Sequence, residues 1–130
     1  MLIEGLVAYL LTQSTVTDVV GVRIQPIPAT EDFATNPGIT VQGISDVSEN
    51  AGDGPVGVAR QRIVFDCTAP RYLAARNLAI ALKQLLNGYV GTLPDGTKVQ
   101  LAESVNLVDR WDDGSRISCT SLHVLFTYSD

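Results

Sequence analysis

The sequence contains few of the residues on which most catalytic and metal sites depend. Its 130 residues include one histidine, two cysteines and one tryptophan, and only 18% of them are charged. Because His123 has no second histidine near it, a metal site or a Ser–His–Asp triad has little support. We therefore expect neither an enzyme nor a bound cofactor or metal.

Long apolar runs and an excess of basic residues are also missing. The N-terminal stretch MLIEGLVAYLLTQ is too short and too interrupted to span a membrane, and it lacks the basic start of a signal peptide. A net charge of −5 argues against binding nucleic acid by neutralising phosphates. We expect a protein without membrane contact, assembled in a cytosol, in which Cys67 and Cys119 are buried thiols and not a disulfide.

The hydrophobic content of 45% is enough for one domain with its own core. The clearest pattern lies in the middle of the chain, where Ile63, Phe65 and Cys67 alternate with polar residues and predict a strand with one buried face. An amphipathic helix is predicted next, over residues 70–87, and its apolar face consists of Ala75, Leu78, Ala79, Leu82, Leu85 and Leu86.

Weaker patterns flank this strand and helix. An amphipathic helix is predicted over about residues 2–13, with one more helical turn over residues 14–20. Residues 22–27 contain Pro26, which cannot donate to a ladder, so they are expected to form an edge strand or an irregular arm. Another strand begins near Ile39, and a bulge is expected near Gly43.

A hairpin, with strands over residues 89–93 and 99–107, and a final strand are predicted after the central helix. The Asp95-Gly96 pair indicates a tight hairpin turn, and the last strand carries Leu122, Val124, Phe126 and Tyr128 on one face. Because Ile117 and Cys119 have the opposite parity, a bulge or bend is expected near Ser121. Together these patterns predict a single α+β domain over residues 1–130, with an antiparallel or mixed sheet of about four to five strands and two helices packed on it.

Residues 48–59 are rich in Gly, Asn and Asp and predict a long hairpin loop. Gly52, Gly54 and Gly57 spell G-x-G-x-x-G, but no helix follows them, so a dinucleotide site is rejected. The loop is a candidate partner surface, through the residues Glu49, Asp53, Gly54 and Pro55.

Four further residues are candidates for a subunit interface. Leu73 and Ile80 are seven residues apart on the otherwise polar side of the central helix, as expected if a neighbouring subunit covers them. Arg60 and Arg62 share a strand face with Asp66, which favours cross-strand pairing or a subunit contact over catalysis.

Several segments resemble the phage tail terminators of the small tail-completion type, which include siphophage minor tail protein U-like and tail-to-head joining proteins. The resemblance covers nearly the whole chain. It depends on the segments LIEGLVAYLL, GVRIQPIP, NPGITVQGIS, DGPVGVARQRIVFDCTAPRYLAARNLAIALKQLLNG and SLHVLFTY.

This resemblance implies a structural role in the virion tail or neck. Members of the family form a ring, commonly a homohexamer, that caps the tail tube, stops its polymerisation and offers a surface for the head. The implied partners are further copies of the chain, the major tail tube protein and a head-closure protein. Genome DNA would pass through the ring without specific binding, in keeping with the net negative charge.

Two alternatives remain open from the sequence. One is a head-closure or adaptor protein of the neck, which would also form a ring but bind on the portal side. The other is a small α+β ligand-binding or enzyme domain, against which the scarcity of histidine, cysteine and clustered carboxylates argues.

Overall fold

The computed structural model describes residues 2–21, 23–26, 37–51, 54–112 and 117–129, with the backbone alone at residues 45–51, 54–58, 111 and 112. Its elements, in chain order, are α1 (Leu2–Leu10), α2 (Ser14–Val20), β1 (Ile24–Pro26), β2 (Gly38–Ala51), β3 (Gly54–Ala69), α3 (Tyr72–Leu86), β4 (Gly91–Thr92), β5 (Lys98–Asp112) and β6 (Ile117–Ser129).

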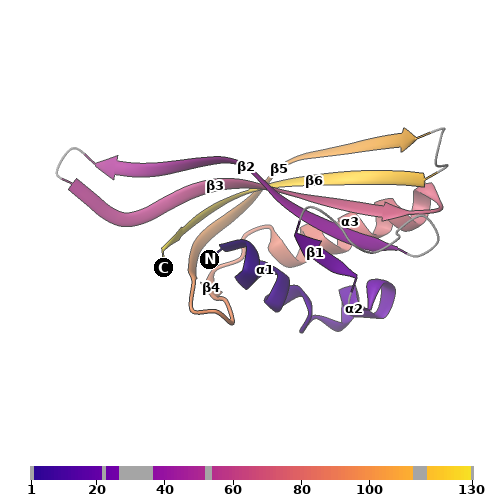
Figure 1. Cartoon of the computed structure of the whole chain (residues 1–130), viewed down its shortest axis with the longest axis horizontal. Helices are drawn as coiled ribbons and strands as arrows, with labels where there is room; N and C mark the ends of the chain where they lie inside the picture. Colours follow the sequence, from indigo (N-terminus) through magenta and orange to yellow (C-terminus); the bar gives the residue numbers. More distant parts are fainter. Residues whose placement is uncertain (1, 22, 27–36, 52–53, 113–116, 130) are drawn as a thin grey trace.

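The strands form one mixed sheet in the order β1-β2-β3-β6-β5-β4. β1 is parallel to β2, and every other neighbouring pair is antiparallel. The helices all lie on one face of the sheet (Figure 1). The α+β class is confirmed, but the predicted four to five strands and two helices are too few for the six strands and three helices described. The difference lies in the count: α2, with seven residues, was expected as one more turn of the first helix, and β1, with three residues, as either an edge strand or an irregular arm. β4 has only two residues and therefore little periodicity to read.

The predicted pairing of a central strand with an amphipathic helix forms the core. Phe65 of β3 lies against Phe126 of β6, with ring centroids 6.3 Å apart in an edge-to-face arrangement. The apolar face predicted for α3 is buried beneath them, through Ala75, Leu78, Ala79, Leu82 and Leu86. Alternation in β3 and the helical period in α3 therefore aim the two apolar faces at each other.

The start of α3 differs from the expected one. β3 continues to Ala69, which pairs with Ser118 of β6, so the chain is still extended just before residue 70, where the helix was expected to begin. The helix begins at Tyr72, and Arg71 occupies its N-cap position without a side-chain hydrogen bond. At the other end Gly88 has a φ of 81°, the left-handed conformation that a glycine after a helix end commonly adopts.

The prediction of a long hairpin loop at residues 48–59 is wrong. Ser48 pairs with Ala59, Asn50 with Pro55, and Ala51 with Gly54, so β2 and β3 continue as a hairpin almost to residues 52 and 53, which lie outside the described residues. The ladder established nearer the core fixes the register, and pairing then overrides the weak strand propensity of Gly, Asn and Asp. The bulge expected near Gly43 is confirmed by a register shift between Gly43 and Ser45.

The bulge expected in β6 near Ser121 is also wrong. The β3–β6 ladder continues without a shift from Ala59 and Tyr128 to Ala69 and Ser118. Ser118 and Thr120 take the buried side where hydrophobic residues were expected, and Thr120 compensates by donating to Asp109 Oδ1 at 2.9 Å. The irregularities lie in β5 instead, between Val99 and Leu101 and between Ser104 and Asn106.

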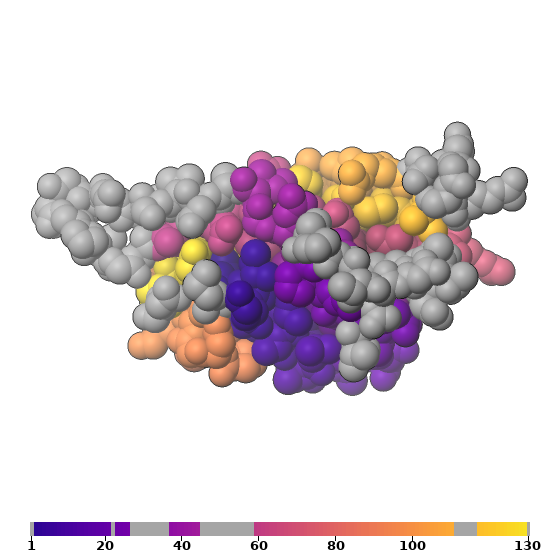
Figure 2. Space-filling view, viewed as in Figure 1, coloured from indigo at the N-terminus to yellow at the C-terminus, as the bar shows by residue number. Residues whose placement is uncertain are grey.

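Helix α1 packs beside the β4–β5 turn. Figure 2 shows α1, in indigo, next to the orange residues of that turn. The contact is close at Gly5, where a side chain would meet the carboxylate of Asp95. Within the described part of the chain, no helix is both long and apolar enough to cross a membrane.

Candidate subunit interface

The outer side of α3 carries the two apolar residues that the sequence assigned to an interface. Leu73 is 66% exposed and Ile80 is 36% exposed, so neither belongs to the core. Their seven-residue spacing corresponds to two helical turns and places them on one side of the helix. The predicted exposure is confirmed; contact with a neighbouring subunit remains a prediction.

This side of α3 runs next to the outer edge of β5. Near the helix start, Arg76 Nη1 lies 2.8 Å from Asp109 Oδ2, and the Tyr72 hydroxyl lies 3.4 Å from the same oxygen. Near the helix end, the Ser104 N–H donates to Asn87 Oδ1 at 3.0 Å. The helix and the strand are thus held together at both ends of their shared length.

A groove of about 430 Å³ lies between these two fixed ends. Its lining residues are Arg76, Ile80, Lys83, Gln84, Asn87 and Leu107. Ile80 and the half-buried Leu107 supply an apolar surface, and Arg76 and Lys83 supply positive charge. Such a surface suits an extended partner segment that carries acidic and apolar residues.

The carboxylate of Asp109 holds one end of this groove. Burial raises the pKa of Asp109, but hydrogen bonds from Thr120 and Arg76, with the charge of Arg76, outweigh it and lower the pKa below its ordinary value. Asp109 is therefore ionised at neutral pH and keeps Arg76 in place on the helix side of the sheet.

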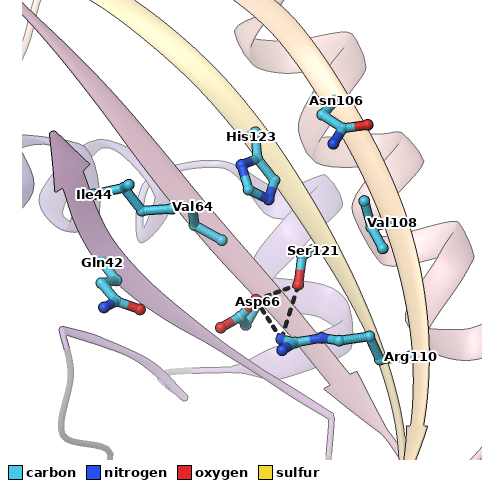
Figure 3. Close-up of a pocket in the computed structure, with 9 residues that line it drawn as sticks. All are labelled: Gln42, Ile44, Val64, Asp66, Asn106, Val108, Arg110, Ser121 and His123. Atoms are coloured by element: carbon cyan, nitrogen blue, oxygen red, sulfur yellow. Dashed lines mark hydrogen bonds and ion pairs between the residues drawn. The ribbon is translucent and has the colours of Figure 1, made fainter.

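A second candidate surface lies on the opposite, helix-free face of the sheet. It is a shallow depression of about 340 Å³, formed by residues of β2, β3, β5 and β6 (Figure 3). The lining residues are Gln42, Ile44, Val64, Asp66, Asn106, Val108, Arg110, Ser121 and His123.

Asp66, Ser121 and Arg110 form a polar cluster in this depression (Figure 3). The Ser121 hydroxyl donates to Asp66 Oδ1 at 2.5 Å. Arg110 Nη2 donates to the same oxygen at 3.2 Å and to Ser121 Oγ at 3.0 Å. The cluster joins three strands across the sheet, which is the cross-strand pairing expected for Asp66, although its partners are on β5 and β6 and not Arg60 or Arg62.

Asp66→Ala is expected to lower the free energy of unfolding by about 1–3 kcal/mol, because Ser121, which is only 4% exposed, loses its acceptor. Arg110→Ala is the matched comparison and should cost less than about 1 kcal/mol, since its side chain is 60% exposed. Urea denaturation followed by circular dichroism measures both. Equal losses in the two variants would contradict the assignment of Asp66 as the buried acceptor.

His123 is the neighbouring member of this face. Arg62 Nε donates to His123 Nδ1 at 3.1 Å, so this ring nitrogen acts as the acceptor of a neutral imidazole. Burial lowers the pKa of His123, the charges of Arg62 and Arg110 lower it further, and the charge of Asp66 opposes them. His123 is half-buried and acts as a hydrogen-bond acceptor within the sheet.

This lowered pKa predicts a pH-dependent stability. Between the unfolded pKa of about 6.5 and the lower folded pKa, the unfolded chain binds more protons, so stability falls as the pH is lowered through this window. The melting temperature should be lower at pH 5.5 than at pH 7.5, and His123→Gln should reduce that difference. Asp109 contributes only at more acidic pH, because its pKa is already below the ordinary carboxyl value. An equal pH dependence in both proteins would contradict this role of His123.

The sequence-predicted residues do not gather into one site. Leu73 and Ile80 lie on α3, whereas Arg62 belongs to the face opposite the helices and Arg60, which is exposed, precedes it on β3. Glu49 lies in β2, and Gly54 and Pro55 are the first residues of β3. Asp53 lies outside the described residues. Asp109, Leu107 and Asn87 were not predicted from the sequence, because only the packing of α3 against β5 brings Leu107 and Asn87 beside Ile80 and Asp109 beside Arg76.

The described side chains offer little acid–base or metal chemistry. Among them no group of three His, Cys, Asp or Glu residues is arranged to hold a metal ion. Ser121 donates to Asp66, and His123 accepts from Arg62, so the two do not form a nucleophile–base pair. Both cysteines are free; burial, and then the charges of Cys119 and Asp66, raise the pKa of the Cys67 thiol. The described residues instead form two surfaces, the α3–β5 groove and the depression on the helix-free face.

No protein-family model matches the sequence, and no curated protein matches it either. Among solved structures, a chain from the virion of a native gene transfer agent particle is similar, with a TM-score of 0.70 and 14% identity over 92% of this chain and 87% of that chain. A second solved protein, whose name carries no function, has a TM-score of 0.52 and 12% identity over 92% and 86% of the two chains. At these identities the likeness establishes the fold: this chain has the fold of a protein found in a gene transfer agent virion.

Proposed function

We propose that this chain is a structural protein of a phage or phage-like virion, and that within the virion it is a tail terminator. The observation that carries the proposal is the fold shared with a chain of a gene transfer agent virion over nearly the full length of both. The sequence segments that resemble tail terminators support the narrower role. Such a protein works by recognition of neighbouring subunits and not by chemistry.

In this role, about six copies form a ring that caps the tail tube, stops its polymerisation and receives the head. The exposed Leu73 and Ile80 on α3, beside a groove with Arg76 and Lys83, supply a surface for a neighbouring subunit. The major tail tube protein and a head-closure protein contact the two sides of the ring. The ring is assembled in the host cytoplasm and remains in the tail or neck of the virion.

The acidic charge suits the passage of DNA. Six copies at −5 each carry a formal charge of about −30, which repels DNA phosphates and lets the genome pass without specific binding. Arg62 and Arg110 do not offset this charge at a phosphate site, since Arg62 is bonded to His123 and Arg110 to Asp66.

The outer part of the β2–β3 hairpin, which includes Glu49, Gly54 and Pro55, is assigned to the ring lumen or to the contact with an adjacent ring. Replacement of residues 49–56 by an Asn-Gly turn is expected to leave monomer stability unchanged, because β6 pairs with β3 only from Ala59 onward. It should reduce tail-to-head joining. The measurement is the yield of joined particles beside the melting temperature of the monomer, and normal joining by a stable, shortened protein would remove this role from the hairpin.

Tube growth tests the proposed function. The tail tube protein of the same virion is polymerised with and without the chain, and tube lengths are measured by negative-stain electron microscopy. A terminator arrests growth at substoichiometric amounts, since it acts at tube ends. Tubes of unchanged length, together with binding to the portal-side proteins, would identify the chain as a head-closure or adaptor protein instead.

A further inference from the structure

Among the described residues, the sheet has two long edge segments without a partner strand. At one edge, β4 pairs with β5 only at Lys98 and Val99. Further along β5, the two residues that follow α3 satisfy two edge groups: the Gly88 N–H donates to Ala102 O, and the Ser104 N–H donates to Asn87 Oδ1. From Asn106 to Asp112 no described strand lies on the outer side of β5. The Leu107 N–H is bonded instead to Oδ1 of the neighbouring Asn106 side chain, at 2.9 Å.

The opposite edge of the sheet is open over a similar length. β1 pairs with β2 only at Ile39, Thr40 and Val41. From Gln42 to Ala51 no described strand lies on the outer side of β2. Exposed edges of this length are templates for pairing with another chain, and soluble proteins usually cover or interrupt them.

The directions of the strands make these two edges complementary. From β2 through β3 and β6 to β5 every neighbour is antiparallel, so β2 and β5 run in opposite directions. A second copy in the same orientation, placed beside the first, would therefore bring its β2 antiparallel to β5. Within one chain Gln42 is level with Asn106, so the two open segments extend toward opposite ends of the sheet, and they meet when the second copy is displaced along the strands by about seven residues, or roughly 24 Å. The contact is head-to-tail: each copy gives one edge and receives the other, as a closed ring requires.

We propose that the Asn106–Asp112 edge of β5 receives the Gln42–Ser48 segment of β2 from the next copy as an antiparallel strand, which leaves the hairpin tip from Glu49 onward outside this contact. This inference rests on the proposed ring and names the contact that closes it. The incoming strand lies over the α3–β5 groove, where main-chain hydrogen bonds supply affinity and side-chain contacts supply specificity.

The charges of the two surfaces support a second copy as the occupant. The groove carries Arg76 and Lys83, whereas the Gln42–Ser48 segment contains Asp46 and no lysine or arginine. The incoming segment also brings Ile44, which is 55% exposed in the single chain and would extend the apolar surface of Val108 across the junction. Pairing of the two edges thus joins opposite charges and covers exposed apolar side chains.

Engineered disulfides test this contact. Gln42, Ile44, Asn106 and Val108 all line the helix-free face, so a cysteine from β2 and one from β5 would meet on one side of a shared sheet. Within one chain, β3 and β6 separate the two strands, at three spacings or about 14 Å, far beyond the Cα separation of about 7 Å that a disulfide allows. Any bond between them is therefore intermolecular.

Four double variants pair a cysteine at residue 42 or 44 with one at residue 108 or 110, in a Cys119→Ser background that keeps the buried Cys67; Arg110 lines the same helix-free face. Two-residue steps along each strand sample different registers, and the 44/110 pair corresponds to full overlap of the two open segments. The matched controls are the four single-cysteine variants. Each protein is oxidised with and without the tail tube protein, and it is then sized by light scattering and by non-reducing gel electrophoresis.

We expect at least one double variant to give a ladder of covalent multimers up to the ring, and the single variants to remain uncrosslinked. Rings of normal mass without a covalent product in any of the four double variants would overturn the edge pairing and leave the ring intact. Covalent dimers of the single variants would also overturn it, because they indicate a symmetric contact. Proteins that stay monomeric even with the tube protein would overturn the proposed function together with this contact.

Discussion

The Leu82→Asp variant is expected to be unfolded. Leu82 is fully buried in the cluster where α3 meets the sheet. An unpaired buried charge costs about 3–5 kcal/mol, and the loss of a packed leucine side chain costs about 2–5 kcal/mol more. Together these costs are comparable with the whole stability of a small domain, about 5–15 kcal/mol. Circular dichroism and thermal melting should show no cooperative transition.

Asn77→Asp is the matched control, since it places the same side chain at an exposed position of the same helix. It should change the free energy of unfolding by less than about 0.5 kcal/mol. A Leu82→Asp protein that melts cooperatively near the temperature of the control would show that this face of α3 is not the centre of the core.

The Leu73→Glu/Ile80→Glu double variant is expected to keep its fold and lose the ring. Both side chains lie at the surface of the single chain, so the substitutions leave no buried charge behind. In a ring, each subunit contact would then bury two carboxylates in an apolar interface, at a cost of several kcal/mol per contact. Light scattering should give the mass of a monomer, 13.9 kDa, while the melting curve stays cooperative.

Thr15→Glu/Thr92→Glu provides the control, because both threonines are exposed and the added charge is the same. This control should assemble like the unchanged protein. If the Leu73→Glu/Ile80→Glu protein also assembles normally, the outer side of α3 takes no part in the ring.

The parts of the fold that the sequence predicted are those with a strong local period. Ile63, Phe65 and Cys67 alternate, and Leu78, Leu82 and Leu86 recur at helical spacing, so each pattern permits only one element. The prediction of a loop at residues 48–59 failed because Gly, Asn and Asp favour loops locally. The β2–β3 ladder, which begins in the core, continues into this segment and keeps it extended. The bulge predicted in β6 failed for a similar reason. The buried side of the strand was inferred from hydrophobicity, but the ladder with β3 places the polar residues Ser118 and Thr120 on that side.

The candidate interface was predictable only in its helical half. Leu73 and Ile80 stand out because apolar residues at a seven-residue spacing are unexpected on a polar side. Leu107, Asp109 and Asn87 are ordinary residues in the sequence and acquire a role only because α3 packs along β5. The open edges of β2 and β5 were likewise beyond sequence reasoning, since they follow from the strand order.

Cryo-electron microscopy of tail tubes grown in the presence of the chain tests the central claim most directly. The account predicts a six-fold ring at one end of each tube, with the mass of six 13.9-kDa copies, about 83 kDa. In that ring, density for β2 of one subunit should continue the sheet of its neighbour at β5. Tubes that carry the chain along their length, or at neither end, would contradict the assignment of this chain as a tail terminator.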